Sequence, residues 1–137
     1  MSESPHTEST PNKKVEQGRM VQTLENHGAS IVAEKTPGIY VLSFKLDDAV
    51  TTIRISLEDL SGADLVITHM TTLPEEKINL GLGSSALQNL LSWARENNLA
   101  DIRAVQVQNE SESFWTKNGF AKCAEPNPTN DFTLKTV

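Results

Sequence analysis

The chain has 137 residues, a length at which one domain can bury a substantial apolar core. Its formal charge of −6 argues against a nucleic-acid binder, which would show a basic face, and it suits a cationic acceptor such as an amine. One cysteine excludes an internal disulfide and fits a reducing compartment. Because we also find no run of about eighteen apolar residues and no signal-peptide core, we expect a cytoplasmic protein with no membrane partner.

The N-terminal part is polar at first and then amphipathic. Residues 1–13 have no apolar period, so we expect a disordered tail ahead of a single domain, residues 14–137. From Val15 to Asn26 a thin apolar stripe predicts one short helix. Gly28 suits the C-terminal cap of that helix, because glycine readily takes the left-handed conformation that such caps need.

Four stretches with strand character come next, and short turns separate them. They are Ser30–Glu34, Ile39–Leu46, Val50–Leu57 and residues 64–72. Strands joined by short connections pair antiparallel with their neighbours in the sheet. These stretches therefore predict an antiparallel meander.

A pair of glycines marks the junction between the last of these strands and a helix. Gly81 and Gly83 let the backbone turn tightly and leave its amides uncovered, and Ser84 adds a hydroxyl donor. The free N–H groups and partial positive charge of a helix start can hold a phosphate. The alternative is that the glycines only make a tight connection. The helix is predicted by apolar residues at three- and four-residue spacing, namely Ala86, Leu87, Leu90, Leu91, Trp93 and Ala94.

The last third of the chain alternates between strand and helix signals. The stretch Ile102–Val107 predicts a parallel neighbour for the strand at 64–72. Asn109 and Glu112 have the spacing of a capping pair that opens a short helix, which we expect to end near Asn118. Two closing strands are expected at Phe120–Ala124 and Phe132–Thr136.

Two segments carry motifs of a known enzyme family, in matching order and spacing. The run after the strand reads Leu73-Pro74-Glu75-Glu76-Lys77-Ile78-Asn79-Leu80-Gly81-Leu82-Gly83, which is similar to Val-x-Pro-x-x-Arg/Gln-x-x-Gly-x-Gly/Ala. The later segment reads Gln108-x-x-Ser111-x-x-Phe114-Trp115-x-x-x-Gly119-Phe120, which is similar to Asn-x-x-Ala-x-x-Phe-Tyr-x-x-x-Gly-Phe. Over residues 63–124 the chain therefore resembles the GNAT superfamily of acyl-CoA-dependent N-acyltransferases.

The resemblance implies a fold and a co-substrate. The fold is α+β, of the three-layer α/β kind, with a mixed central sheet. Its antiparallel meander is followed by a central helix, a parallel strand, a short helix and closing strands. The co-substrate is acetyl-CoA or coenzyme A, held between the two parallel strands. The binding residues implied are Leu73, whose backbone polarises the thioester carbonyl, then Lys77, Ile78, Asn79, Leu80, Gly81, Leu82, Gly83 and Ser84 around the pyrophosphate, and Gln108, Asn109, Phe114 and Trp115.

Three departures from the family pattern bear on activity. Ile78 replaces an arginine or glutamine that contacts phosphate, so the backbone amides and the neighbouring Lys77 remain for that contact. Trp115 replaces a tyrosine that often protonates the departing thiolate, and an indole cannot donate that proton. One short helix stands where the family has a strand and two helices. We therefore expect an acceptor site that is more open than usual, or one that a second subunit completes in a homodimer.

Few residues could take the proton of an attacking amine. His69 lies on the strand before the glycines, and histidine side chains titrate near neutral pH. If Ile67 and Thr71 share a face with His69, the imidazole points toward the acceptor. The alternative is a hydrogen-bonded histidine without catalytic use. Glu58 is a second candidate, which could relay a proton through water. We expect no metal site.

We therefore expect an N-acetyltransferase that moves an acetyl group from acetyl-CoA to a primary amine by direct attack. The amine belongs to a small molecule or to a protein. The alternative is a catalytically inactive coenzyme A-binding module of the same fold, with a regulatory or interaction role. The missing tyrosine and the reduced acceptor region favour this second interpretation, whereas family members that work without the tyrosine favour the first. A third interpretation is the same fold with no ligand.

Overall fold

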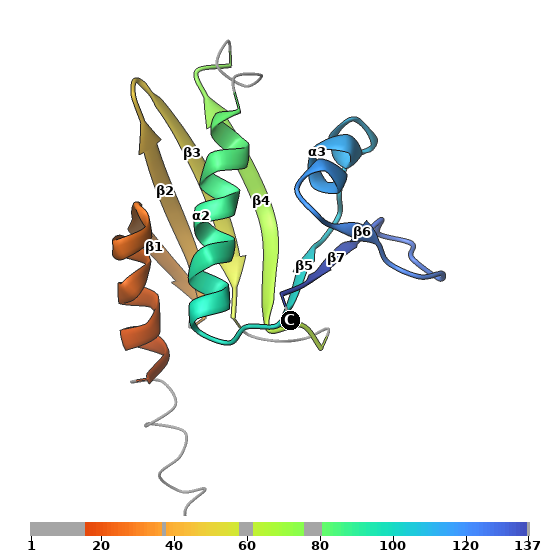
Figure 1. Ribbon diagram of the computed structural model, residues 1–137, viewed down its shortest axis with the longest axis horizontal. Coiled ribbons are helices and arrows are strands. Elements are labelled where there is room, and N and C mark those ends of the chain that lie inside the picture. The colour runs from red at the N-terminus through yellow and green to blue at the C-terminus, as the bar shows by residue number, and fades with distance from the viewer. Residues whose placement is uncertain (1–15, 37, 58–61, 76–80, 137) are drawn as a thin grey trace, which may run out of the picture.

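The structure is a computed structural model that describes residues 16–36, 38–57, 62–75 and 81–136 (Figure 1). Within these ranges seven strands form one sheet, in the order β1-β2-β3-β4-β5-β7-β6. The strands are β1 (Ala29–Thr36), β2 (Ile39–Leu46), β3 (Ala49–Ser56), β4 (Leu65–Leu73), β5 (Asp101–Ala104), β6 (Ala121–Lys122) and β7 (Phe132–Lys135). The helices are residues 16–22, continued by the 3₁₀ turn η1 (Thr23–His27), then α2 (Leu82–Glu96), the 3₁₀ turn η3 (Asn109–Ser111) and α3 (Glu112–Lys117). The predicted tail, residues 1–13, lies outside the described residues.

The sheet confirms the predicted α+β fold. Strands β1 to β4 form the antiparallel meander, and β2 pairs with β3 without interruption from Ile39 to Leu46. Strand β5 runs parallel to β4, and β7 and β6 close the sheet as an antiparallel pair. Most strand ends differ from the prediction by one or two residues. The larger difference is that β5 ends at Ala104 rather than at Val107, and β6 is a two-residue strand.

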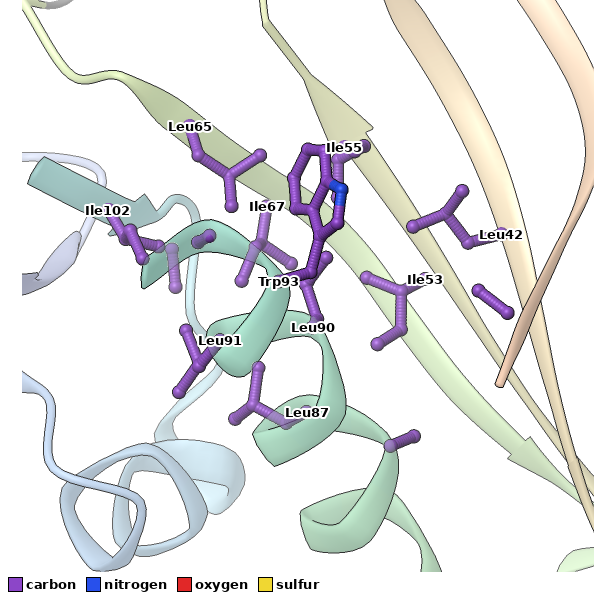
Figure 2. Packing of buried hydrophobic residues seen from close by; sticks show 14 of the residues in the cluster. Leu42, Ile53, Ile55, Leu65, Ile67, Leu87, Leu90, Leu91, Trp93 and Ile102 are labelled. Carbon is purple, nitrogen blue, oxygen red and sulfur yellow. The ribbon is translucent and has the colours of Figure 1, made fainter. Parts of the chain in front are cut away.

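Helix α2 packs its apolar stripe against one face of the sheet (Figure 2). Every predicted residue of that stripe is buried, and the stripe meets Ile53 and Ile67 of the central strands. Trp93 of this stripe also contacts the N-terminal helix, where its indole N–H donates to the Met20 carbonyl at 3.0 Å and to the Thr23 hydroxyl at 2.9 Å. The N-terminal helix and α2 therefore cover the same side of the sheet (Figure 1).

The other side of the meander carries no helix in the described part of the chain. Cross-strand pairing puts alternate residues of β2, β3 and β4 on this side, which we call the open face. Its members are Ile39, Val41, Ser43, Lys45, Val50, Thr52, Arg54, Ser56, Val66, His69, Thr71 and Leu73. Leu42, Ile53 and Thr72 point to the α2 side and are buried, whereas Arg54 and His69 on the open face are exposed.

Candidate functional site

A cleft opens where β4 and β5 separate. The last hydrogen bond between the two segments runs from the Val105 N–H to the Ile67 carbonyl, at 3.1 Å. Beyond it Gln106 has a φ of +56°, a left-handed conformation that few non-glycine residues take. Its N–H donates to Asp131 Oδ1 at 3.0 Å, which holds the chain toward the connection between β6 and β7. Among the described residues, Thr68–Leu73 therefore continue β4 with no strand paired on the β5 side.

The cleft has a volume of about 740 Å³. Its walls come from the second half of β4, the first turn of α2, the segment after β5, and the η3–α3 region. The lining residues used below are Thr68–Leu73, Gly81, Gly83, Ser84, Val105–Gln108, Phe114, Trp115 and Lys117. The lining mixes polar and apolar groups, and a concave site of this size is typical of a small-molecule site.

The first turn of α2 borders this cleft. Gly81 precedes the helix with a φ of +81°, a conformation that favours glycine, and no side chain caps the first turn. The first helical hydrogen bond runs from the Ser85 N–H to the Gly81 carbonyl at 3.0 Å. The N–H groups of residues 82–84 therefore have no hydrogen-bond partner within the helix. The turn holds no acidic residue. This end of the cleft therefore carries a partial positive charge that can hold an anion.

Gly83 has a different role from Gly81. It is buried where α2 crosses β4. A Cβ at this position would lie 3.3 Å from Met70 Cε, 3.5 Å from Thr72 Oγ1 and 3.6 Å from Phe114 Cε1. The first glycine of the motif thus permits the turn into the helix. The second permits the close approach of helix, strand and α3.

Ser84 couples the start of α2 to the end of α3. Its hydroxyl oxygen accepts a hydrogen bond from Asn118 Nδ2 at 3.1 Å, and Asn118 Oδ1 accepts one from Gln88 at 3.1 Å. A hydroxyl group can accept and donate at the same time. Ser84 can therefore still donate to an anion in the cleft while it holds the two helices together.

A β-bulge sets the direction of His69. Arg54 of β3 pairs with His69, and the next residue, Ile55, pairs with Ile67, so Thr68 is an extra residue in β4. One extra residue reverses the alternation of side chains along a strand. Ile67 therefore faces α2, whereas His69 lies on the open face. The condition that Ile67 and Thr71 share a face with His69 is therefore met by Thr71 and not by Ile67.

His69 is exposed and is one of the β4 residues that line the cleft. Its Nε2 lies 3.3 Å from Thr71 Oγ1, and Thr71 belongs to the same face of β4. His69 can therefore be reached both from the cleft and from the open face.

Helix α3 brings the aromatic pair of the second motif to the cleft. The rings of Phe114 and Trp115 meet edge to face with centroids 5.2 Å apart, and Trp115 meets Phe120 in the same way at 5.1 Å. Trp115 is only 7% exposed, so most of its indole belongs to the core. Phe114 is half-buried. Both residues are also among those that line the cleft, so this pair belongs both to the core and to the wall of the cleft.

Glu112 anchors the start of α3. Its carboxylate accepts a hydrogen bond from Asn130 Nδ2 at 2.8 Å and lies 3.4 Å from Lys122 Nζ. The hydrogen bond from Asn130 lowers the pKa of Glu112, and the Lys122 ammonium lowers it further, against an opposing rise from desolvation. The predicted capping pair is wrong, because Glu112 is engaged here and Asn109 opens a separate 3₁₀ turn with no side-chain cap.

The structure brings part of the predicted coenzyme-binding set together. Leu73, Gly81, Gly83, Ser84, Gln108, Phe114 and Trp115 all line the cleft, and Leu82 belongs to the first turn of α2. Asn109 is exposed and is not among the lining residues. Lys77, Ile78, Asn79 and Leu80, with the catalytic candidate Glu58, lie outside the described residues. Sequence reasoning missed Gln106 and Asp131, since a glutamine after a strand gives no signal of left-handed backbone.

Two solved structures resemble this fold. An acetyltransferase from Thermus thermophilus aligns with a TM-score of 0.56 and 19% identity, over 85% of this chain and 71% of that chain. Ard1 from Thermoplasma volcanium aligns with a TM-score of 0.50 and 21% identity, over 82% of this chain and 74% of that chain. By sequence, the chain matches no family model and no curated protein.

The chain has a GNAT-like fold, the architecture of these acetyltransferases. At these identities the likeness concerns the fold, so the chemistry must be argued from the cleft. In the ranges that the structure describes, no helix has the length and apolar character needed to span a membrane.

Proposed function

We propose that this protein transfers an acetyl group from acetyl-CoA to a primary amine. One observation carries the proposal: the cleft between the separated strands β4 and β5 borders the uncapped first turn of α2. A thioester with a long polar arm and a pyrophosphate needs these two features side by side. The unpaired side of Thr68–Leu73 offers backbone partners to the arm. The first turn of α2 offers N–H groups to the phosphates.

The chain's own residues supply the remaining steps. A backbone N–H near Leu73 polarises the thioester carbonyl. The amine nitrogen attacks the carbonyl carbon, the new C–N bond forms, and the C–S bond breaks. His69 accepts the proton that the amine releases, because it lies where the cleft meets the open face. The thiolate takes its proton from solvent, since Trp115 has no acidic group.

A second candidate function is coenzyme A binding without catalysis. The observation that favours it is Trp115, which fills the position of the family's tyrosine with a largely buried indole. The variant Trp115→Tyr separates the two candidates. If the variant releases thiol from acetyl-CoA faster than the parent chain in the presence of an amine, the site catalyses transfer, and proton donation to the thiolate limits the rate in the parent chain. If neither chain releases thiol while both bind acetyl-CoA, the binding module is the better description.

The first test is a titration of the full chain with acetyl-CoA and with free coenzyme A, followed through backbone amide NMR shifts. We expect saturable shifts at Leu73 and at Gly81, Gly83 and Ser84, which line the cleft. Thiol release with a panel of amines then measures transfer. If neither ligand moves these amides at millimolar concentration, the glycine junction is only a turn and the proposal is refuted.

A further inference from the structure

The open face differs in composition from the chain as a whole. Its rows run across β2, β3 and β4, from Lys45 beside Val50 and Leu73 to Ile39 beside Ser56. Most of its side chains are small hydroxyl or β-branched groups. None of its members is an aspartate or a glutamate, although the chain contains 18 acidic residues.

The charge of the open face is opposite to that of the whole chain. Lys45 and Arg54 are exposed cations on it, and Arg54 is the cross-strand partner of His69. The adjoining part of the same side has a carboxylate, Asp101 on β5, but Lys135 pairs with it at 2.8 Å. Among the twelve named members of the open face the charged side chains are therefore cationic, whereas the formal charge of the chain is −6.

The open face is also the wrong shape for a small molecule. Its four rows extend roughly 20 Å along the strands, since alternate residues of a strand lie about 6.7 Å apart. The face has no helix over it to form a wall, and small-molecule sites are concave. A surface of this length, with both polar and apolar side chains in its rows, instead suits a polypeptide segment. Such a segment could lie along the strands and bring its amine to His69, where the face meets the cleft.

We propose that the open face docks an acidic polypeptide, and that this polypeptide is the acceptor. The role as acceptor rests on the proposed acetyl transfer, whereas the docking itself does not. Lys45 and Arg54 attract the carboxylates of the segment. The row of hydroxyl groups formed by Ser43, Thr52 and Thr71 gives it polar contacts, and the amine enters the cleft beside His69.

The test compares two peptides that differ only in charge. Each has a free N-terminal amine, followed by a run of glutamates in one peptide and of arginines in the other. Each is titrated into the labelled full chain. We expect the glutamate peptide to bind about tenfold more tightly, with amide shifts at Val41, Arg54 and Thr71. Equal or tighter binding of the arginine peptide would overturn the inference, and so would shifts that map to another surface.

Charge-reversed variants identify the surface. Arg54→Glu and Lys45→Glu should each weaken binding of the glutamate peptide about fivefold. Lys45 is distant from the imidazole, so its variant tests docking without disturbing His69. The matched control is Arg95→Glu, at an exposed site in the last turn of α2, which should leave the affinity unchanged. If both open-face variants bind as tightly as the parent chain, the inference is wrong.

Two further readouts separate this inference from its alternatives. Open-face shifts that depend on protein concentration without peptide would indicate a second copy as the occupant, and would overturn the acidic polypeptide. The acetyl-CoA titration is scored at Gly81 and Ser84, away from the peptide. If acetyl-CoA shifts neither of these amides, the proposed acetyl transfer is refuted, whereas the inference that the open face docks an acidic polypeptide is not affected. Failure of peptide discrimination with acetyl-CoA bound refutes the docking alone.

Discussion

The imidazole of His69 is placed by a single bulged residue, and the proposed chemistry depends on it. The variant His69→Gln keeps a polar side chain but cannot accept a proton at neutral pH. We expect it to lower kcat by about 100-fold, the usual contribution of a general base, because the amine must then lose its proton to water. Thiol release with a reactive amine measures this rate. Acetyl-CoA binding should be unchanged, since the backbone around residue 69 does not depend on the imidazole.

The matched control is His27→Gln. His27 lies on the N-terminal helix, where its Nε2 is 3.0 Å from Glu96 Oε1, on the side of the sheet away from the open face. We expect its rate to equal that of the parent chain. If His69→Gln retains full activity while the parent is active, His69 is a surface histidine, and the proton goes directly to solvent.

Glu112 gives the fold a measurable pH dependence. Its pKa is lowered in the folded chain, chiefly by the hydrogen bond from Asn130, so folding favours the ionised carboxylate. The stabilisation is therefore fully present above the ordinary glutamate pKa of about 4.3, and it is lost as the pH falls through the lower folded-state value. Glu112→Gln should reduce the free energy of unfolding near neutral pH, and its difference from the parent should shrink toward acid pH.

Urea denaturation at several pH values measures this difference. Glu25→Gln, at an exposed glutamate of η1, is the control and should differ little from the parent at any pH. A difference for Glu112→Gln that stays constant down to strongly acid pH would mean that the carboxylate contributes through its contacts alone and that its ionisation is not linked to folding.

At the scale of one element, the start of α2 assigns separate roles to two neighbouring glycines. Gly81 has a φ of +81°, and a Cβ added there would meet no atom within 4 Å. The variant Gly81→Ala is therefore strained by its backbone conformation and not by contacts with neighbouring residues. We expect it to lower the free energy of unfolding by about 1 kcal/mol, and to weaken acetyl-CoA binding because the first turn shifts. Thermal or urea unfolding, with the NMR titration, measures both effects.

Gly83→Ala is the matched comparison in the same motif. Its φ is not in the left-handed region, and alanine favours a helix over glycine by about 1 kcal/mol. The new methyl group meets the flexible end of Met70 at 3.3 Å, which can move. We therefore expect a stability close to that of the parent chain. If Gly83→Ala proved the more damaging variant, close packing rather than backbone conformation would be the main constraint on this motif.

The pattern of apolar residues was sufficient to predict most elements. Apolar residues at three- and four-residue spacing from Ala86 to Ala94 form one face of a helix, and every predicted residue of that face is buried against the sheet. Alternation in Ile39–Leu46 matched β2 at both ends. Gly28 caps the N-terminal helix with a φ of +88°, as glycine at that place indicates. These features are set by local sequence, so they can be read from it.

The details of the site depend on contacts between distant segments. The bulge at Thr68 arises from the register in which β4 pairs with β3, and no residue type within β4 indicates that register. The left-handed Gln106 is held by Asp131, which is distant in sequence. Glu112 has the spacing of a cap but finds a stronger partner in Asn130. Sequence therefore predicted that residues near 69, 81 and 114 form a site, but not which way they face.

At the scale of the whole molecule, the distribution of charge bears on the oligomeric state. Two copies could cover each other's open faces. Such a dimer would agree with the expectation that a second subunit completes the acceptor site. In a twofold dimer, however, the same patch meets itself. Lys45 and Arg54 would then face a surface with the same cations and no carboxylate to pair with them. Each copy also carries a formal charge of −6, so the net charges of two copies repel each other.

We therefore expect the chain to be monomeric. Sedimentation velocity at increasing protein concentration should give one species with the mass of a single chain. A species of twice that mass would contradict the prediction. If Arg54→Glu then strengthened the dimer by giving each face a carboxylate for Lys45 of the other copy, the open face would be the interface. If Arg54→Glu had no effect, the dimer would use another surface, and the open face would stay accessible to an acceptor.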